Sequence, residues 1–433
     1  MSAPAATPRL DAAIHALTLT MALAMLTISP MALGALGWNY DAPGGSGPTR
    51  FHPATYLAAT ILLLGALRDG NPLTSLGAAF FGDARLALFL LAWALLLLHG
   101  TMNQGLPAAA PIDTFLLPLI ILVIHGRAAP ATRHRLAWLI HGGLALNALV
   151  GLGEFATGLR LTPYVAGGVA ITGDWRSTAL LGHPLGNALI TGCYTATLLV
   201  GGGRELAGPA RGAAIALQTA AMIAFGGRAS LVLLVLFLLA ALGRQMFRAL
   251  AGARTRLSTL TVLAFVVPAG LGLVGLLAEA GFFEKFLLRF TEDKGSANAR
   301  VLMFELFDGF TWPELLFGPP QAHLGYLVNL YRLEYGIESF WVAFSLYYGL
   351  LPALVFFAGL LFFLAALAAR CRPAALVILG YFFVVNSSFL GIAGKTIGFA
   401  TLILMLLTLL PAVPDIARSA PIRSFPVRRP LPC

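Results

Sequence analysis

The stretch that decides the fold class is FWVAFSLYYGLLPALVFFAGLLFFLAAL, which runs from Phe340 to Leu367. It contains no Asp, Glu, Lys or Arg, and it is longer than the roughly 20 apolar residues that a helix needs to cross a bilayer. A helix satisfies its backbone hydrogen bonds internally, which is why apolar stretches of this length cross membranes as helices. This stretch therefore predicts a membrane-spanning segment.

Comparable apolar stretches recur from one end of the chain to the other. The 433 residues are 58% hydrophobic and 11% charged, whereas soluble domains carry about 25% charged residues. The first apolar stretch, Ala13–Leu36, is too long for the hydrophobic part of a cleavable signal, so we interpret it as a membrane span. This composition excludes an ordinary soluble globule.

We predict that residues 1–433 form a single all-α polytopic membrane domain with about 12 transmembrane helices. We find no internal repeat. The second, fourth, seventh and eighth predicted spans are short for a bilayer about 30 Å thick. The predicted spans are Ala13–Leu36, Phe51–Leu67, Leu86–Met102, Ile112–Ile124, Leu136–Phe155, Ala179–Val200, Ala213–Phe225, Leu231–Leu242, Leu257–Leu277, Phe340–Leu367, Ala374–Leu390 and Ile397–Leu410.

The formal net charge of +10 suits two classes of protein, those that bind nucleic acid and membrane proteins with basic cytoplasmic loops. If both termini are cytoplasmic, most of the 28 Lys and Arg residues fall in predicted cytoplasmic segments, including a tail at 412–433. The short outer loops carry only Arg50, Arg160, Arg176, Arg228 and Lys395. This asymmetry favours the membrane protein, oriented with both termini inside, and no nucleic-acid partner.

One outer segment is long, from Glu279 to Glu338, between predicted spans nine and ten. Loops of this length are usually functional or disordered. Its apolar residues recur every three to four positions, which predicts an amphipathic helix near the membrane interface, ended by Trp312-Pro313 and the Gly318–Pro320 turn. These apolar residues are Val301, Leu302, Phe304, Leu306, Phe307 and Phe310. We expect 279–338 to be an ordered and functional outer loop.

The polar groups of the outer face form a limited set rich in arginine. The arginine side chain holds phosphate oxygens in pairs and stays charged in a partly dry site. Several arginines at one membrane surface suit a pyrophosphate whose lipid tail lies in the bilayer. The candidate residues are Arg176, His183, Asn187, Arg228, Ser230, Arg289, Arg300, His323 and Glu338.

Each of these residues also has a purely structural interpretation. A single outer arginine often extends to the lipid headgroups, and the two glycines before Arg228 are needed for a tight turn in any case. His183 can serve as a structural hydrogen-bonding group. Glu338 can complement the dipole of the helix that follows it. The functional interpretation therefore depends on the whole set of residues.

The order of these motifs resembles the O-antigen ligase and Wzy-type polysaccharide polymerase superfamily, most strongly from Glu154 to Phe357. Four features carry the resemblance. They are Arg176 before Gly182–Asn187, the Gly-Arg-x-Ser sequence at Gly227–Ser230, Ser296-x-x-x-Arg300 followed by Leu316-Phe317-Gly318, and Tyr348-Gly349-Leu350. Each motif is weak alone, and their order within the predicted spans is more specific.

The resemblance implies an all-helical, glycosyltransferase C-like fold in a bacterial inner membrane, with a periplasmic active site. It also implies that 279–338 is a periplasmic loop that carries part of this site. The donor would be a glycan on undecaprenyl pyrophosphate, held by Arg176, Arg228 and Arg300 with Arg289 as a helper. His183, Asn187 and Ser230 would support that site. The transfer would be inverting, without a metal or other cofactor, and Cys193, Cys371 and Cys433 show no metal-binding spacing.

One departure from the family pattern bears on the reaction. Glu338 stands where ligases of the family carry a histidine, followed by Ser339 and, after nine residues, Gly349. A carboxylate can act as general base, and His323 is the alternative. We therefore favour polymerisation of lipid-linked repeat units, as in exopolysaccharide or O-antigen synthesis, over ligation, in which lipid A-core is the acceptor.

A third interpretation is a polysaccharide or lipid transporter. Twelve spans with both termini inside is a common transporter layout. However, transporters usually carry ionisable groups near the middle of the membrane and show repeated halves. This sequence shows neither clearly, and the polar residues within its spans, Asn147, Asn187 and Asn386, are neutral.

Overall fold

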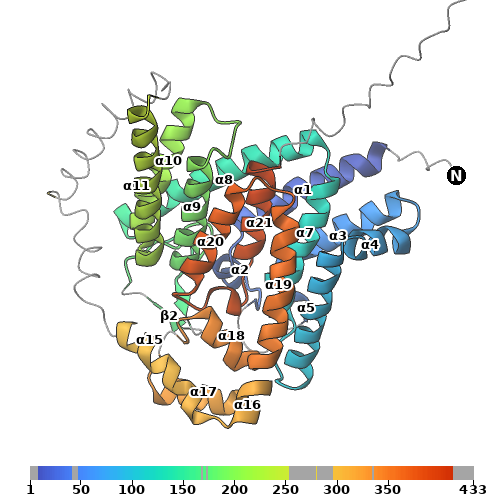
Figure 1. Ribbon diagram of the computed structural model, residues 1–433, viewed down its shortest axis with the longest axis vertical. Helices are drawn as coiled ribbons and strands as arrows, with labels where there is room; N and C mark the ends of the chain where they lie inside the picture. Colours follow the sequence, from blue (N-terminus) through green and yellow to red (C-terminus); the bar gives the residue numbers. More distant parts are fainter. Residues whose placement is uncertain are drawn as a thin grey trace, which may run out of the picture.

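In the computed structural model the chain forms a helical bundle (Figure 1). The structure describes residues 8–40, 47–166, 169–171, 174–252, 279, 296–333 and 336–412. The helices are α1 (Pro8–Thr27), α2 (Pro30–Ala35), α3 (Pro53–Arg68), α4 (Pro72–Phe81), α5 (Ala84–Met102), α6 (Ala109–Pro111), η2 (Ile112–Leu116), α7 (Leu117–Arg127), α8 (Pro130–Thr157), α9 (Pro184–Leu199), α10 (Gly208–Phe225), α11 (Arg228–Leu250), α15 (Ser296–Glu305), α16 (Trp312–Phe317), α17 (Gln321–Leu330), α18 (Phe340–Tyr348), α19 (Leu350–Ala368), α20 (Ala374–Asn386) and α21 (Gly398–Leu409). Short 3-10 helices are η1 (Gly47–Arg50), η4 (Leu306–Gly309) and η5 (Gly391–Ala393).

Six helical segments among the described residues are long and apolar enough to cross a membrane. They are α1, α5, the run from α6 to α7, α8, α11 and α19. Four shorter apolar helices accompany them, namely α3, α4, α20 and α21. The chain is thus a helical, multi-pass membrane protein. The count of 12 spans stays a prediction, and the expected ninth span, Leu257–Leu277, lies outside the described residues.

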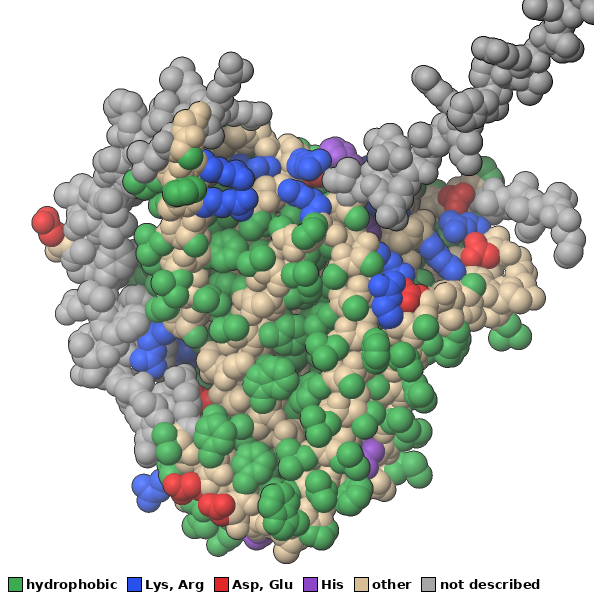
Figure 2. All heavy atoms as spheres, in the orientation of Figure 1, with side chains coloured by type: hydrophobic (Ala, Val, Ile, Leu, Met, Phe, Trp, Pro, Cys, Tyr) green, Lys and Arg blue, Asp and Glu red, His purple; other side chains and the backbone are tan. Residues whose placement is uncertain are grey.

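The two ends of the bundle differ in character. At one end, which we call the loop end, lie the β1–β2 hairpin (Val165–Ala166 and Val169–Ala170) and the helices α15 to α17 (Figure 1). Blue Lys and Arg side chains gather at the opposite end, which we call the basic end, and green apolar side chains cover the surface between them (Figure 2). An apolar belt between polar ends is the pattern of a protein that crosses a membrane.

Helix α9 occupies the centre of the bundle, packed against α10, α11, α20 and α21. Nearly all its side chains are buried, including the hydroxyls of Thr195 and Thr197, which donate to the carbonyls of Thr191 and Cys193 one turn earlier. A helix shielded from lipid on all sides can carry such polar groups, because neighbouring helices replace the hydrocarbon around it.

Two expected spans are each divided into two helices. The predicted span Ala13–Leu36 is α1 and α2, because Pro30 disfavours a helical residue before it and Ser29 caps α2 by accepting from the Ala32 N–H at 3.0 Å. The predicted span Phe340–Leu367 is α18 and α19, separated by Gly349 at φ +88°. The continuous-span predictions were wrong at both positions.

The break at Gly349 is occupied by the end of α16, which belongs to the predicted outer loop, 279–338. A Cβ added at Gly349 would lie 2.4 Å from the Gly318 amide nitrogen, so only glycine permits this approach. His99 and Gln104, at the end of α5, both hydrogen-bond the Phe317 carbonyl, at 2.8 and 3.0 Å. The end of α16 is therefore fixed to the junction of α18 and α19.

The expected amphipathic helix in the outer loop is α15 with η4. Met303 and Leu306 are buried there, and Val301 and Phe304 are exposed. The helix ends before Trp312, as expected, but Trp312 and Pro313 begin the next helix, α16, and so are more than an interruption. A proline in the first turn loses no helical hydrogen bond, since its missing N–H would be unpaired there.

Candidate functional site

The connection between α8 and α9 at the loop end is held by buried polar side chains of α8. Glu154, 7% exposed, accepts from the backbone N–H groups of Thr178, Ala179 and Leu161 at 2.7 to 2.9 Å. The Asn147 side-chain oxygen accepts from the next two N–H groups, of Leu180 and Leu181. These bonds satisfy donors that burial would otherwise leave unpaired.

Asn187 and Ser177 hold the same connection from two other directions. The Asn187 amide in the first turn of α9 donates to the carbonyls of Thr178 and His183. Ser177 donates its hydroxyl to the Gly151 carbonyl and its backbone N–H to the Ala224 carbonyl in α10. Ala179 keeps φ at +41° within this network, a conformation that alanine adopts only where its surroundings impose it. Asn187 is thus a positioning residue.

This anchored connection presents Arg176, whose side chain is buried. Its Nε and one terminal nitrogen donate to the Asp174 carboxylate, which also accepts from the Arg176 backbone N–H at 2.9 Å. The guanidinium lies over the Tyr164 ring, 5.5 Å from its centroid. The carboxylate and the aromatic face together fix the position of this buried cation.

The turn between α10 and α11 lies directly against Arg176. Gly226, at φ +64°, ends α10, and a Cβ there would come within 2.8 Å of the Arg176 side chain. A Cβ added at Gly227 would lie 2.4 Å from the Cβ of Ala188 in α9, so this position is equally crowded. Arg228, which is half-buried, is the first residue of α11 and follows this turn at once. The structure therefore brings the Arg176 and Arg228 motifs together, although 51 residues lie between the two arginines in the sequence.

His183 precedes α9 beside this pair of arginine segments. Its ring meets the Tyr164 ring edge-on, with centroids 5.6 Å apart. Burial and, to a smaller extent, the positive charge of Arg176 lower the His183 pKa to about 4, against the opposing effect of Asp174. The imidazole is therefore neutral at neutral pH and makes no side-chain capping bond to α9.

Ser230 lies buried in the first turn of α11, and its carbonyl accepts from the Tyr381 hydroxyl at 2.7 Å. That hydroxyl also fills the space beside Gly192 of α9. Tyr381 of α20 thus links α9 to the start of α11, behind Arg228. Sequence reasoning did not select Tyr381 or Tyr164, because an aromatic residue in an apolar stretch gives no signal of its partner. The Asp174-x-Arg176 spacing was visible and indicates such an ion pair.

The two candidate bases lie on different elements. Glu338 is half-buried just before α18, whose start is held when Trp341 donates its indole N–H to Ser387 at 2.8 Å. His323 is exposed on α17, edge-on to the Phe310 ring at 5.3 Å and stacked on Tyr326. The described contacts of His323 stay within the outer loop.

The remaining two arginines are only partly placed. Arg300 lies in α15, but its side chain is outside the described part of the chain. Arg289 lies entirely outside the described residues. Their predicted roles stay predictions.

Comparison with protein-family models, with curated proteins and with solved structures finds no match to this chain. The resemblance drawn from its motifs therefore stays a prediction. The structure itself shows that Arg176, buried in the α8–α9 connection, packs against Gly226 in the turn before Arg228.

Proposed function

We propose that the chain is an inner-membrane glycosyltransferase that polymerises undecaprenyl-pyrophosphate-linked oligosaccharide repeat units at the periplasmic face. The loop end would face the periplasm and the basic end the cytoplasm, in keeping with the excess of basic residues on cytoplasmic loops. The products would be exopolysaccharide or O-antigen chains. The ligase reaction, with lipid A-core as acceptor, is the alternative within the same chemistry.

The observation that supports the proposal best is the packing of Gly226 against the Arg176 side chain. Two arginine-bearing motifs thus meet at one end of the bundle, and in the proposed orientation a lipid-linked donor would lie in the leaflet at that end. A pyrophosphate carries several oxygens, and paired arginines can grip them from two sides. A single arginine extending to lipid headgroups would not need to be buried between Asp174 and Tyr164.

The proposed reaction is an inverting displacement. The acceptor hydroxyl gives its proton to the Glu338 carboxylate, and its oxygen forms a bond to the anomeric carbon of the donor. The bond between that carbon and the pyrophosphate oxygen breaks, and its electron pair leaves with the pyrophosphate. The arginines stabilise the charge that develops on this leaving group.

Arg228→Lys tests the pyrophosphate role. Lysine keeps the charge but loses the planar fork, so transfer from an undecaprenyl-pyrophosphate-linked donor should fall by about 10- to 100-fold. The matched control is Arg50→Lys in η1, an arginine of another predicted outer loop, which should transfer at the wild-type rate. Wild-type transfer by Arg228→Lys, in protein of normal yield, would contradict the role.

Deletion of the gene separates polymerase from ligase. Loss of chain length, with single repeats still attached to their acceptor, indicates polymerase. Loss of all polymer from lipid A-core, with lipid-linked polymer accumulating, indicates ligase. Unchanged glycans with a defect in solute or lipid export would favour the transporter interpretation instead.

A further inference from the structure

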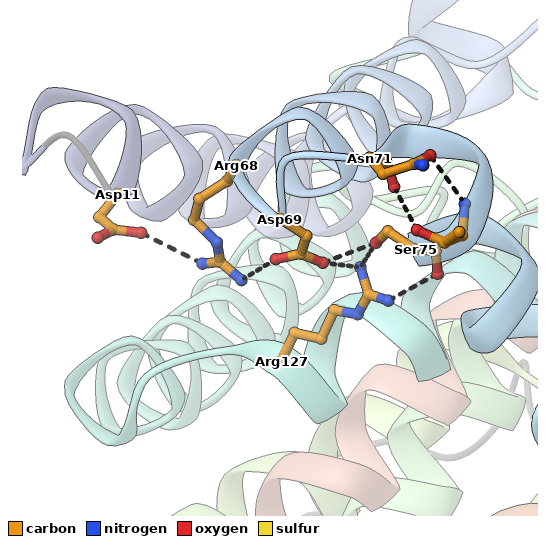
Figure 3. A network of polar contacts seen from close by, with 7 residues as sticks. Asp11, Arg68, Asp69, Asn71, Ser75 and Arg127 are labelled. Carbon is orange, nitrogen blue, oxygen red and sulfur yellow. Dashed lines mark hydrogen bonds and ion pairs between the residues drawn. The ribbon is translucent and has the colours of Figure 1, made fainter. Parts of the chain in front are cut away.

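At the basic end, a cavity of about 480 Å³ opens between α1, α3 and the junction of α7 and α8. It lies at the other end of the bundle from the arginines of the candidate site. Its rim is polar, and a connected network of charged side chains runs along it from α1 to α7 (Figure 3). None of the residues discussed for glycosyl transfer lines it.

Three arginines line this cavity, and two of them belong to the network. Arg68 donates to Asp11 at 3.2 Å and to Asp69 at 3.5 Å. Arg127 donates to Asp69 at 3.3 Å and to the Ser75 hydroxyl at 3.0 Å (Figure 3). Asp69 is shared between the two guanidinium groups. The two carboxylates therefore orient both arginines and balance their formal charge.

The third arginine, Arg135, adds a charge that no carboxylate of the described chain neutralises. It donates to His15 Nε2 at 2.8 Å, and His15 Nδ1 lies 2.7 Å from the Thr132 hydroxyl. An arginine can only donate, so His15 Nε2 accepts in this contact. His15 thus holds the Arg135 guanidinium beside the cavity that both residues line.

The beginning of α8 strengthens the positive character of the same rim. This helix starts at Pro130, and its N-cap residue, Ala129, offers no side-chain acceptor. Ala131 and Thr132, in the first turn, line the cavity. The first-turn N–H groups and the positive end of the helix dipole favour an anion there.

The inner wall of the cavity is apolar. It is formed by Ile14 of α1, Ile61 and Leu62 of α3, and Val123 and Ile124 of α7. Gly65 also lines it, and a Cβ added at Gly65 would meet nothing within 4 Å, so the space beside this glycine is open. A small soluble anion needs no apolar wall beside its binding site, whereas an amphiphile does.

We propose that this cavity binds an anionic phospholipid of the membrane leaflet at the basic end. The lipid phosphate would lie among Arg68, Arg127 and Arg135, and the first carbons of an acyl chain would lie along Ile61 and Gly65. A basic rim above an apolar wall, between helices at a membrane boundary, matches both halves of such a lipid. The proposal stands independently of the glycosyltransferase function.

The test uses the purified full chain and counts retained lipid by native mass spectrometry after exposure to phosphatidylglycerol or phosphatidylcholine. Wild-type protein should retain phosphatidylglycerol preferentially. Arg135→Gln should weaken that binding by about fivefold, the effect of one basic residue near a charged lipid surface. Gly65→Leu should abolish it, because the added side chain would take up space in the cavity, and its Cβ would meet nothing within 4 Å. Leucine also favours the helix over glycine, so this variant should fold.

Arg133→Gln is the matched control. Arg133 lies two residues from Arg135, donates to the Gly126 carbonyl at 3.1 Å and does not line the cavity. Its lipid retention should equal that of the wild type. Equal retention by wild type, Arg135→Gln and Gly65→Leu would overturn the proposal. Competition by inorganic phosphate that displaces the lipid completely at millimolar concentration would also overturn it, in favour of a site for a small phosphate solute.

Discussion

At the scale of single residues, the candidate site depends on a carboxylate that takes no part in the proposed chemistry. Three backbone N–H groups of the α8–α9 connection donate to Glu154, and the connection carries Arg176. Loss of a buried acceptor that serves three donors lowers the stability of the fold, because each N–H left without a partner cannot bond to water instead. Glu154 therefore positions Arg176 through the backbone.

Glu154→Gln should show this dependence. The glutamine side chain turns an NH₂ group toward at least one N–H donor, which should cost about 1 to 3 kcal/mol of stability. The melting temperature in detergent should drop by several degrees, and donor binding should weaken. Glu305→Gln, at an exposed position of α15, is the control and should change neither. An unchanged melting temperature for Glu154→Gln would show that the connection is held without this carboxylate.

The assignment of the general base is also a residue-scale question. Glu338→Gln should lower turnover by about 100-fold or more, with donor binding unchanged, because the amide cannot accept the proton. His323→Gln is the paired variant and should retain most of its turnover, since the described contacts of His323 lie within the outer loop. The reverse result, in single-turnover measurements on both variants, would assign the base to His323.

At the scale of elements, the break between α18 and α19 couples the outer loop to the membrane bundle. Gly349 allows the Phe317–Gly318 backbone to enter the break, where His99 and Gln104 bind it from α5. Glu338 begins the segment that leads into α18. The docked loop thus meets one end of α18, and Glu338 precedes the other end.

Gly349→Ala should disturb this docking. A left-handed conformation costs a non-glycine residue about 1 to 2 kcal/mol, and the added Cβ would lie 2.4 Å from Gly318 N. Both stability and turnover should fall. Gly325→Ala in α17 is the control, because a Cβ there meets nothing within 4 Å and alanine favours the helix. If both variants melt and turn over alike, the break does not need glycine.

At the scale of the whole molecule, the proposed function needs the loop end in the periplasm. Cysteine labelling tests this orientation. Cys193 and Cys371 are buried free cysteines, and Cys433→Ser removes the third. Asn329→Cys, exposed on α17, should react with a membrane-impermeant maleimide in intact cells with a permeabilised outer membrane. Arg204→Cys, exposed at the basic end, should react only after lysis. The opposite pattern would exclude a periplasmic site.

The helical membrane class was predictable from the sequence, as were most helix positions. The expected span Leu86–Met102 corresponds to α5 and the span Ile397–Leu410 to α21. Hydrophobic length and charge are sums over neighbouring residues, so they can be read without knowing any contact. The breaks at Pro30 and Gly349 were missed, because hydropathy stays high across a helix break. The helix α4 was also missed. It is a short apolar stretch between the charged residues Asp69 and Asp83, and this stretch was assigned to a cytoplasmic connection.

What the sequence alone determined about this protein is its solvent: a chain with so few charges and such long apolar stretches must lie in a bilayer. Only the tertiary structure decided which polar groups meet there. Arg176 packs beside Gly226, and Arg135 shares a cavity with Arg68, because helices distant in the sequence approach closely where side chains are small or complementary. Such approaches depend on the packing of the whole bundle, and no local pattern of residues encodes them.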